Sequence, residues 1–172
     1  IQVIMGLAGS LTITFGSTSG SATSNRTLDL LLSIFWIVGI TNAINFFDNM
    51  DGAAGGISAL AGFGFAIIGL QNDQYFVAAF GLVLSGACVG YLFWNWNPAK
   101  IYMGDAGALF IGIILAALAV RVDPVSVSGI GAFFVPICVL ALPILDTTTV
   151  VIDRLRRKVS PFEGGLDHLS HR

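Results

Sequence analysis

Long apolar runs separated by short polar segments dominate this chain and limit what it can fold into. A helix needs about 20 apolar residues to cross a bilayer, at a rise of about 1.5 Å per residue. The chain is 55% hydrophobic and only 10% charged, whereas soluble domains carry about 25% charged residues. We therefore predict an all-α, polytopic transmembrane helix bundle with about five full spans, at roughly residues 28–47, 53–70, 76–94, 106–120 and 130–152.

The first 25 residues read differently from the rest. Residues 1–11 are expected to be the tail of an earlier helix, and the Ser/Thr/Gly-rich residues 12–25 a short extracytoplasmic loop or hairpin. The chain starts at Ile1, and no basic segment precedes an apolar core, so a signal peptide is not indicated. We expect one transmembrane domain over residues 1–172, forming the C-terminal part of a larger multi-span protein.

Three polar clusters, at residues 42–52, 95–105 and 154–172, fall on the same side of the membrane when the crossings are counted. That side also holds most of the basic residues, and the opposite side holds only Arg26 and Arg121. Since positive residues concentrate in cytoplasmic segments, we assign the clustered side to the cytoplasm. The net charge of −2 argues against nucleic acid as a partner. The basic residues of the clustered side are Lys100, Arg154, Arg156, Arg157, Lys158 and Arg172.

The first cluster forms a polar stripe if its residues are helical. At about 100° per residue, Asn42, Asn45 and Asn49 lie within about 60° of one another, with Asp48 on the adjoining edge. Gly52 then allows the helix to end. Contact with water or lipid headgroups would explain any one of these residues. Their convergence on one stripe favours a lined cavity.

The second cluster joins two predicted spans. Pro98 ends the first of them, and Asp105 lies near the N-terminus of the second, where a carboxylate is favourable. Helix capping therefore explains Asp105 as well as a functional role does. Helix N-termini also bind phosphate, and a carboxylate with Mg²⁺ at that position would suit a diphosphate ligand.

The third cluster begins with a basic segment, residues 154–158, typical of a juxtamembrane anchor. His168 and His171 follow, close to Asp167 and Arg172. No third protein ligand for a metal is evident, so phosphate contact or proton handling is the better functional interpretation. Asp146, within the last span, is expected to hydrogen-bond nearby threonines or another helix rather than to act in catalysis.

Together these segments resemble the polyprenyl-phosphate N-acetylhexosamine-1-phosphate transferases, glycosyltransferase family 4, which are related to phospho-N-acetylmuramoyl-pentapeptide transferase. Residues 36–52 resemble the family's Asn-Ala-x-Asn-x-x-Asp-Gly-x-Asp-Gly motif, and residues 95–107 its Asn-x-x-Pro-Ala-x-x-Phe-Met-Gly-Asp-x-Gly-Ser motif. Residues 143–147 and 160–172 resemble its last cytoplasmic helix and histidine loop. The chain departs from the family at Asn49, Tyr102 and Ala108, which replace Gly, Phe and Ser, and has a shorter histidine motif.

The resemblance implies an enzyme that transfers a sugar-1-phosphate from a UDP-N-acetylhexosamine to a polyprenyl phosphate such as undecaprenyl phosphate, releasing UMP. It implies Mg²⁺ as cofactor, with Mn²⁺ as the alternative. It also implies a multi-pass protein of the bacterial plasma membrane, in contact with membrane lipids, that acts in cell-wall, lipopolysaccharide or teichoic acid synthesis; a homodimer is left open. The family's upstream aspartate pair has no counterpart here, so the fragment alone is expected to be inactive.

The resemblance also implies roles for individual residues. Asp48 and Asp51 would be catalytic, while Asp105 and Asn45 would hold the metal. A secondary transporter with a polar site between glycine-rich helices is the alternative function, but its polar residues would lie near the bilayer midplane and often within an inverted repeat. Neither feature is visible in this sequence. The predicted substrate-binding residues are Asn42, Asn45, Asn95, Lys100, His168, His171 and Arg172.

Overall fold

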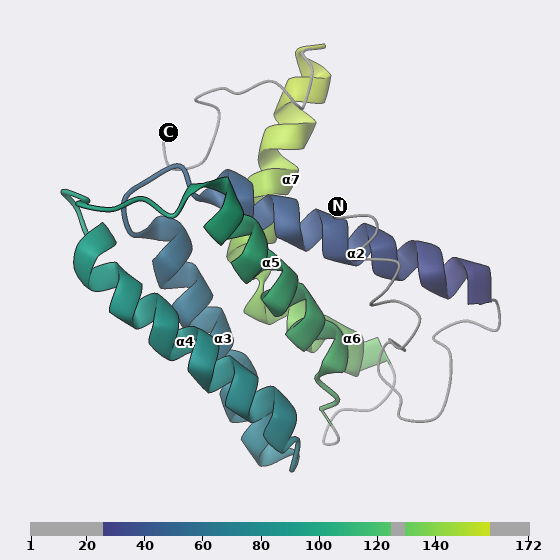
Figure 1. Ribbon diagram of the computed structural model, residues 1–172. Coiled ribbons are helices and arrows are strands. Elements are labelled where there is room, and N and C mark those ends of the chain that lie inside the picture. The colour runs from purple at the N-terminus through teal and green to yellow at the C-terminus, as the bar shows by residue number, and fades with distance from the viewer. Residues whose placement is uncertain (1–25, 125–129, 159–172) are drawn as a thin grey trace.

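The computed structural model describes residues 26–124 and 130–158, and the described part of the chain is helical apart from its turns and loops (Figure 1). This confirms the predicted all-α bundle. The first 25 residues and the histidine loop lie outside the described residues, so the structure says nothing about the predictions made for them. The helices are α2 (Arg26–Phe47), α3 (Ala53–Gln71), α4 (Tyr75–Asn95), α5 (Gly104–Arg121), α6 (Ile130–Val139) and α7 (Ala141–Arg156).

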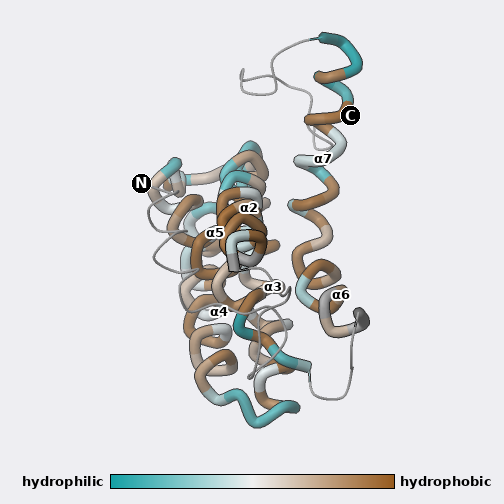
Figure 2. The backbone as a smooth tube through the Cα atoms, turned by 90° about the vertical axis from the view of Figure 1, so that its right-hand side faces the viewer, coloured by the Kyte–Doolittle hydropathy of each residue, from teal (hydrophilic) through white to brown (hydrophobic). Residues whose placement is uncertain are grey.

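Four of these helices, α2 to α5, are long and apolar enough to cross a membrane, judged by length and composition. Their ends fall within about two residues of the predicted ones, because the apolar runs and the turn residues between them mark the ends clearly. Hydropathy along the backbone confirms the pattern, with apolar helices and hydrophilic turns (Figure 2). Large apolar side chains such as Val83 and Phe93 remain 72% and 81% exposed. Such wide exposed apolar surface belongs to a membrane protein.

The fifth predicted span is wrong as a single helix. The structure divides it into α6 and α7, which have 10 and 16 residues, with Leu140 between them. Pro143 explains the break, because it has no N–H to donate to the carbonyl of Val139 and its ring crowds that carbonyl. The chain therefore changes direction about one helical turn before this proline. The buried residues of α7 are Pro143, Asp146, Val150 and Arg154.

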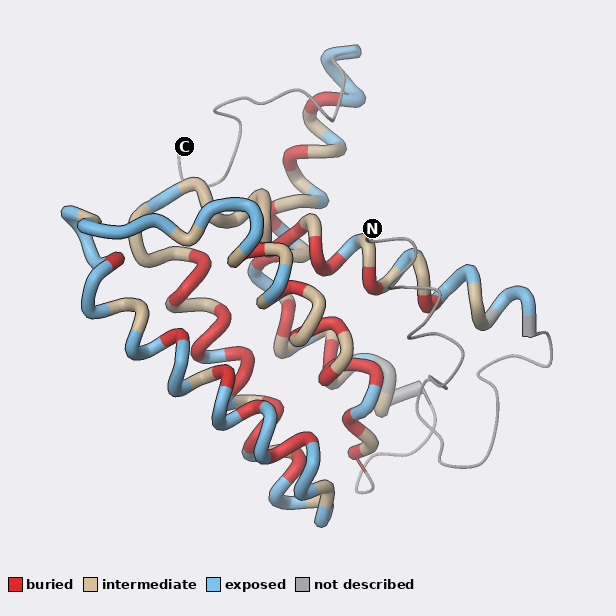
Figure 3. Tube along the Cα trace, in the orientation of Figure 1, coloured by how far each residue is buried: buried red, intermediate tan, exposed pale blue. Residues whose placement is uncertain are grey.

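Glycines set two of the close helix contacts. α3 and α4 form an antiparallel pair in which a Cβ added to Gly62 would lie 2.9 Å from the Gly81 carbonyl oxygen. A Cβ added to Gly81 would lie 2.6 Å from the Gly62 carbonyl oxygen. Between α2 and α5, a Cβ on Gly112 would lie 2.8 Å from Cα of Thr41. Only glycine permits backbones to approach this closely, and the buried faces meet along these contacts (Figure 3).

The two ends of the bundle are distinct. At one end, the Gln74 side chain in the α3–α4 turn donates to the Asp123 carbonyl and accepts from the Asp123 N–H at 3.0 Å. The α3–α4 turn and the end of α5 therefore lie together. It follows that the α2–α3 turn and the α4–α5 loop share the opposite end, as counting the membrane crossings predicted (Figure 1).

Candidate active site

The first polar cluster lies where α2 ends. The helix stops at Phe47, and residues 48–52 form consecutive turns before α3 begins. The predicted helical stripe is therefore wrong for Asp48 and Asn49, which lie beyond the helix. Gly52 is the N-cap residue of α3 and has φ of 75°. This is a left-handed backbone conformation that residues other than glycine rarely adopt. This turn directs α3 back into the bundle. It leaves Asp48 and Asp51 at the end of the bundle, which we call the rim.

Asn95 joins the two polar segments. Its side chain is 3% exposed, at the end of α4. Its Oδ1 accepts a hydrogen bond from the Gly52 N–H at 2.9 Å, and its Nδ2 donates to the Ile101 carbonyl at 2.9 Å. The amide thus holds the α2–α3 turn against the α4–α5 loop. Its predicted substrate-binding role stays a prediction, and the contacts seen here are those of a positioning residue.

Asp51 strengthens the same junction. One of its oxygens, Oδ2, accepts hydrogen bonds from Asn97 Nδ2 at 3.2 Å and from the Ala99 N–H at 3.0 Å. The Asn97–Pro98 peptide bond between these donors is cis. Asp51 therefore fixes the loop that leads to Asp105, and its other oxygen remains available to a ligand. The predicted catalytic role of Asp51 stays a prediction.

Two carboxylates from different elements meet at this rim. Asp105 lies exposed in the first turn of α5, as predicted, and Asp48 lies half-buried in the turn after α2. The pKa of Asp48 is raised above its usual value of 3.8, first by burial and then by the charge of Asp105. Both effects oppose ionisation. A bound cation would relieve the repulsion between the two carboxylates.

The remaining predicted residues differ in what they contact. Asn42 donates from Nδ2 to the Val38 carbonyl one turn earlier, at 2.7 Å. Asn45 is half-buried one turn before Asp48. Lys100 is exposed, and its Nζ lies 5.7 Å from the centroid of the Trp94 ring, a cation–π contact. His168, His171 and Arg172 lie outside the described residues, so the structure does not place them.

The donor set fits a magnesium ion better than a transition metal. Among residues 26–124 and 130–158 there is no group of three or more His, Cys, Asp or Glu side chains that could hold a metal. Asp48 and Asp105 offer charged carboxylate oxygens, and the amide of Asn45 offers a neutral carbonyl oxygen. Mg²⁺ is typically held by one or two carboxylates together with waters and substrate phosphates. An incomplete oxygen site of this kind suits a cation that arrives with a phosphate ligand.

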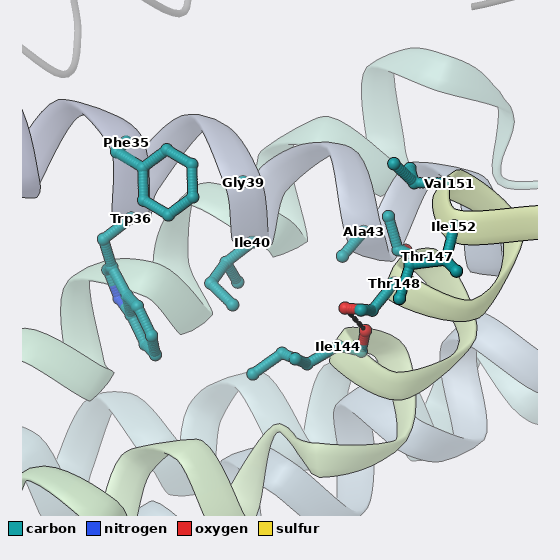
Figure 4. A pocket seen from close by; sticks show the side chains of 10 residues that line it. All are labelled: Phe35, Trp36, Gly39, Ile40, Ala43, Ile144, Thr147, Thr148, Val151 and Ile152. Carbon is teal, nitrogen blue, oxygen red and sulfur yellow. Dashed lines mark hydrogen bonds between the residues drawn. The ribbon is translucent and has the colours of Figure 1, made fainter. Parts of the chain in front are cut away.

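An apolar groove, not predicted from the sequence, lies between α2 and α7. It encloses about 390 Å³. Figure 4 shows side chains of both helices around it, with Phe35 and Trp36 at one end and Thr147, Thr148 and Val151 at the other. Thr148 donates back to the Ile144 carbonyl at 2.6 Å, which satisfies its hydroxyl within the helix. The groove is therefore suited to a hydrocarbon chain. The groove could not be predicted from the sequence, because the residues of both helices have the pattern of ordinary apolar spans.

Comparison with known proteins agrees with this geometry. Residues 1–123 match glycosyl transferase family 4. The chain is 38% identical over 141 residues to a probable undecaprenyl-phosphate N-acetylglucosaminyl 1-phosphate transferase of Bacillus subtilis (strain 168), covering 82% of this chain and 39% of the relative. It is 34% identical over 191 residues to a decaprenyl-phosphate N-acetylglucosaminephosphotransferase of Mycobacterium leprae (strain TN), covering 100% and 48%.

A more distant kind of relative aligns with part of the chain. A phospho-N-acetylmuramoyl-pentapeptide-transferase of Listeria monocytogenes serotype 4b is 40% identical over 93 residues, which cover 54% of this chain and 29% of the relative. The chain thus spans less than half the length of these relatives. The family match covers well over half of the chain and includes both polar segments of the site. The chain therefore belongs to glycosyl transferase family 4.

Proposed function

We propose that the full-length protein transfers N-acetylhexosamine-1-phosphate from a UDP-sugar to a polyprenyl phosphate and releases UMP, as a step of bacterial cell-envelope glycan synthesis. The observation that carries the proposal is the convergence of Asp48 and Asp105 at one end of a bundle of apolar helices. The names of the B. subtilis and M. leprae relatives, which specify polyprenyl-phosphate acceptors, support the same reaction.

Mg²⁺, held by Asp105 and Asn45, would supply charge neutralisation to the diphosphate of the donor. In the proposed reaction, a bond forms between the acceptor phosphate and the sugar phosphate, and the bond to UMP breaks. Such transfer depends mainly on positioning and on stabilising charge. We assign catalytic roles to Asp48 and Asp51, which line the rim. Substrate binding is assigned to Asn42, Asn45, Asn95, Lys100, His168, His171 and Arg172.

The apolar groove supports a lipid acceptor. It runs beside α2 as far as Ala43, which lies little more than one turn before Asp48. A hydrocarbon chain in this groove would leave its phosphate near the polar end of α2. The groove would hold the chain by van der Waals packing, because a hydrocarbon chain in the bilayer is already out of water. We therefore assign the groove between α2 and α7 to the part of the polyprenyl chain nearest the phosphate.

The distribution of positive charge supports a site that faces the cytoplasm. Lys100 lies in the loop at the site end, and α7 extends past that end (Figure 1). α7 carries Arg154 and Arg156, and Arg157 and Lys158 follow directly after it. Arg121 lies at the opposite end of α5. Positive residues favour the cytoplasmic side of a membrane. The cytoplasm also supplies nucleotide sugars, which fits the proposed donor.

Asp105→Asn in the full-length protein tests the proposal. The variant is expected to lose Mg²⁺-dependent UMP release from UDP-N-acetylglucosamine and polyprenyl phosphate, because it removes the carboxylate of the proposed cation site. Asp123→Asn is the matched control, since Asp123 lies at the opposite end of the bundle and is bound there through its backbone. Normal turnover by the Asp105 variant would remove the metal role, and transport of a UDP-sugar without UMP release would favour a transporter.

A further inference from the structure

Tyr91 lies inside the site although its place in an apolar helix suggests ordinary packing. It is on α4, one helical turn before Asn95. Its ring packs against the start of α3, where a Cβ on Gly55 would lie 3.1 Å from Tyr91 Cδ1. The ring is half-buried, but its hydroxyl oxygen has no accessible surface and no hydrogen-bond partner. The residue is thus held rigidly with an unsatisfied polar group at its tip.

The surroundings of this hydroxyl are charged. Asp48 and Asp51 both act electrostatically on the phenol, and the backbone amide of Met103 lies beside its oxygen. The Met103 N–H can only donate to the phenol oxygen, so this group is no acceptor for the hydroxyl proton. Asp51 engages its loop through Oδ2. The phenol is therefore a hydrogen-bond donor without an acceptor, set beside carboxylates that do not accept from it.

A buried hydroxyl without a partner is unfavourable, and native structures satisfy nearly all such groups. A ligand that accepts from the Tyr91 hydroxyl must also bind close to Asp48 and Asp51, whose negative charges would repel a bare anion. A diphosphate bound to a divalent cation meets both conditions, because the cation offsets the charge of the nearby carboxylates while phosphate oxygens accept from donors.

We propose that the Tyr91 hydroxyl donates a hydrogen bond to a phosphate oxygen of the cation-bound nucleoside diphosphate donor, as a binding residue of this site. The inference rests on the proposed function and adds a residue to it. Since the hydroxyl is covered and lies against Met103, the ligand reaches it only when that part of the loop shifts. Gly104, the residue after Met103, has φ of 66° and as a glycine has the backbone freedom that such a shift requires.

The test compares Tyr91→Phe with Tyr75→Phe in the full-length protein. Phe keeps the ring that packs on Gly55 and removes only the hydroxyl. Tyr75 is the matched control, because it lies at the other end of α4 and its hydroxyl donates to Asp73 at 3.3 Å. Affinity for UDP in the presence of Mg²⁺ is measured by titration calorimetry, and KM for UDP-N-acetylglucosamine by UMP release. Melting temperature is measured with and without UDP and Mg²⁺.

Tyr91→Phe is expected to weaken UDP binding and raise KM about tenfold or more, whereas Tyr75→Phe leaves both near wild type. The ligand-free melting temperature should stay equal or rise, since an unsatisfied group has been removed, and UDP should raise it less than in wild type. Unchanged UDP affinity would overturn the inference. So would a ligand-free variant that melts lower or fails to fold, because the hydroxyl would then be structural. Wild-type protein that binds UDP but releases no UMP would refute the proposed function alone.

Discussion

Replacing Asn95 by Leu should separate the two polar segments of the site without altering their charges. The substitution keeps a buried side chain of similar length but leaves the Gly52 N–H and the Ile101 carbonyl without their partners. Leaving a buried group unsatisfied costs about 1–3 kcal/mol. Ile101 is exposed, so water can replace part of its lost bond, while Gly52 is only partly accessible. We expect a total destabilisation of about 2–4 kcal/mol.

Thermal unfolding of the purified full-length protein in detergent, without metal or nucleotide, measures this effect. Asn97→Leu is the control, because Asn97 is in the same loop, carries the same amide and is exposed. It loses one exposed hydrogen bond to Asp51, which keeps its bond from the Ala99 N–H. The loss of this bond should lower the free energy of unfolding by less than about 1 kcal/mol. If both variants have the melting temperature of wild type, Asn95 does not hold the two segments together.

Two further substitutions test the acidic pair and the groove. Asp48→Asn should raise the melting temperature of metal-free protein at neutral pH and abolish UMP release, because ionised Asp48 is opposed by burial and by Asp105. Its folded pKa is above the usual 3.8, so wild type gains stability as the pH falls through that raised pKa; identical stability–pH curves for the two proteins would contradict this reasoning. Gly39→Phe adds a large side chain at the wall of the groove, where no atom lies within 4 Å of an added Cβ. It should raise KM for polyprenyl phosphate about tenfold or more and leave UDP affinity unchanged, and a wild-type KM would remove the groove from the lipid path.

The helices were predictable because their physical cause is local. Apolar residues must leave water, backbone groups in a membrane must pair within the helix, and glycine, proline and polar residues mark the turns. The ends of α2 to α5 follow from this, as does the placement of Asp105 in a first helical turn. The break before Pro143 was not predictable from a proline in an apolar run alone, because Pro136 lies in the same run and stays inside α6.

The polar residues needed the tertiary structure before their roles could be separated. Asn95 and Asp51 look like site residues in the motif, yet their side chains bind backbone and loop groups 43 and 48 residues away. Asn49 fits a helical stripe that ends before it. Which oxygen is satisfied and which remains available depends on partners distant in sequence, and no local pattern encodes that.

Hydropathy and ordered motifs are properties of neighbouring residues, so they are enough to indicate a membrane helix bundle of glycosyl transferase family 4 with acidic residues at one end. The packing of the helices is needed to show that the charge of Asp105 opposes the ionisation of Asp48, that Tyr91 presents an unsatisfied hydroxyl near Asp48, and that α2 and α7 line an apolar groove. These features arise between helices, from the distances at which packed elements come together.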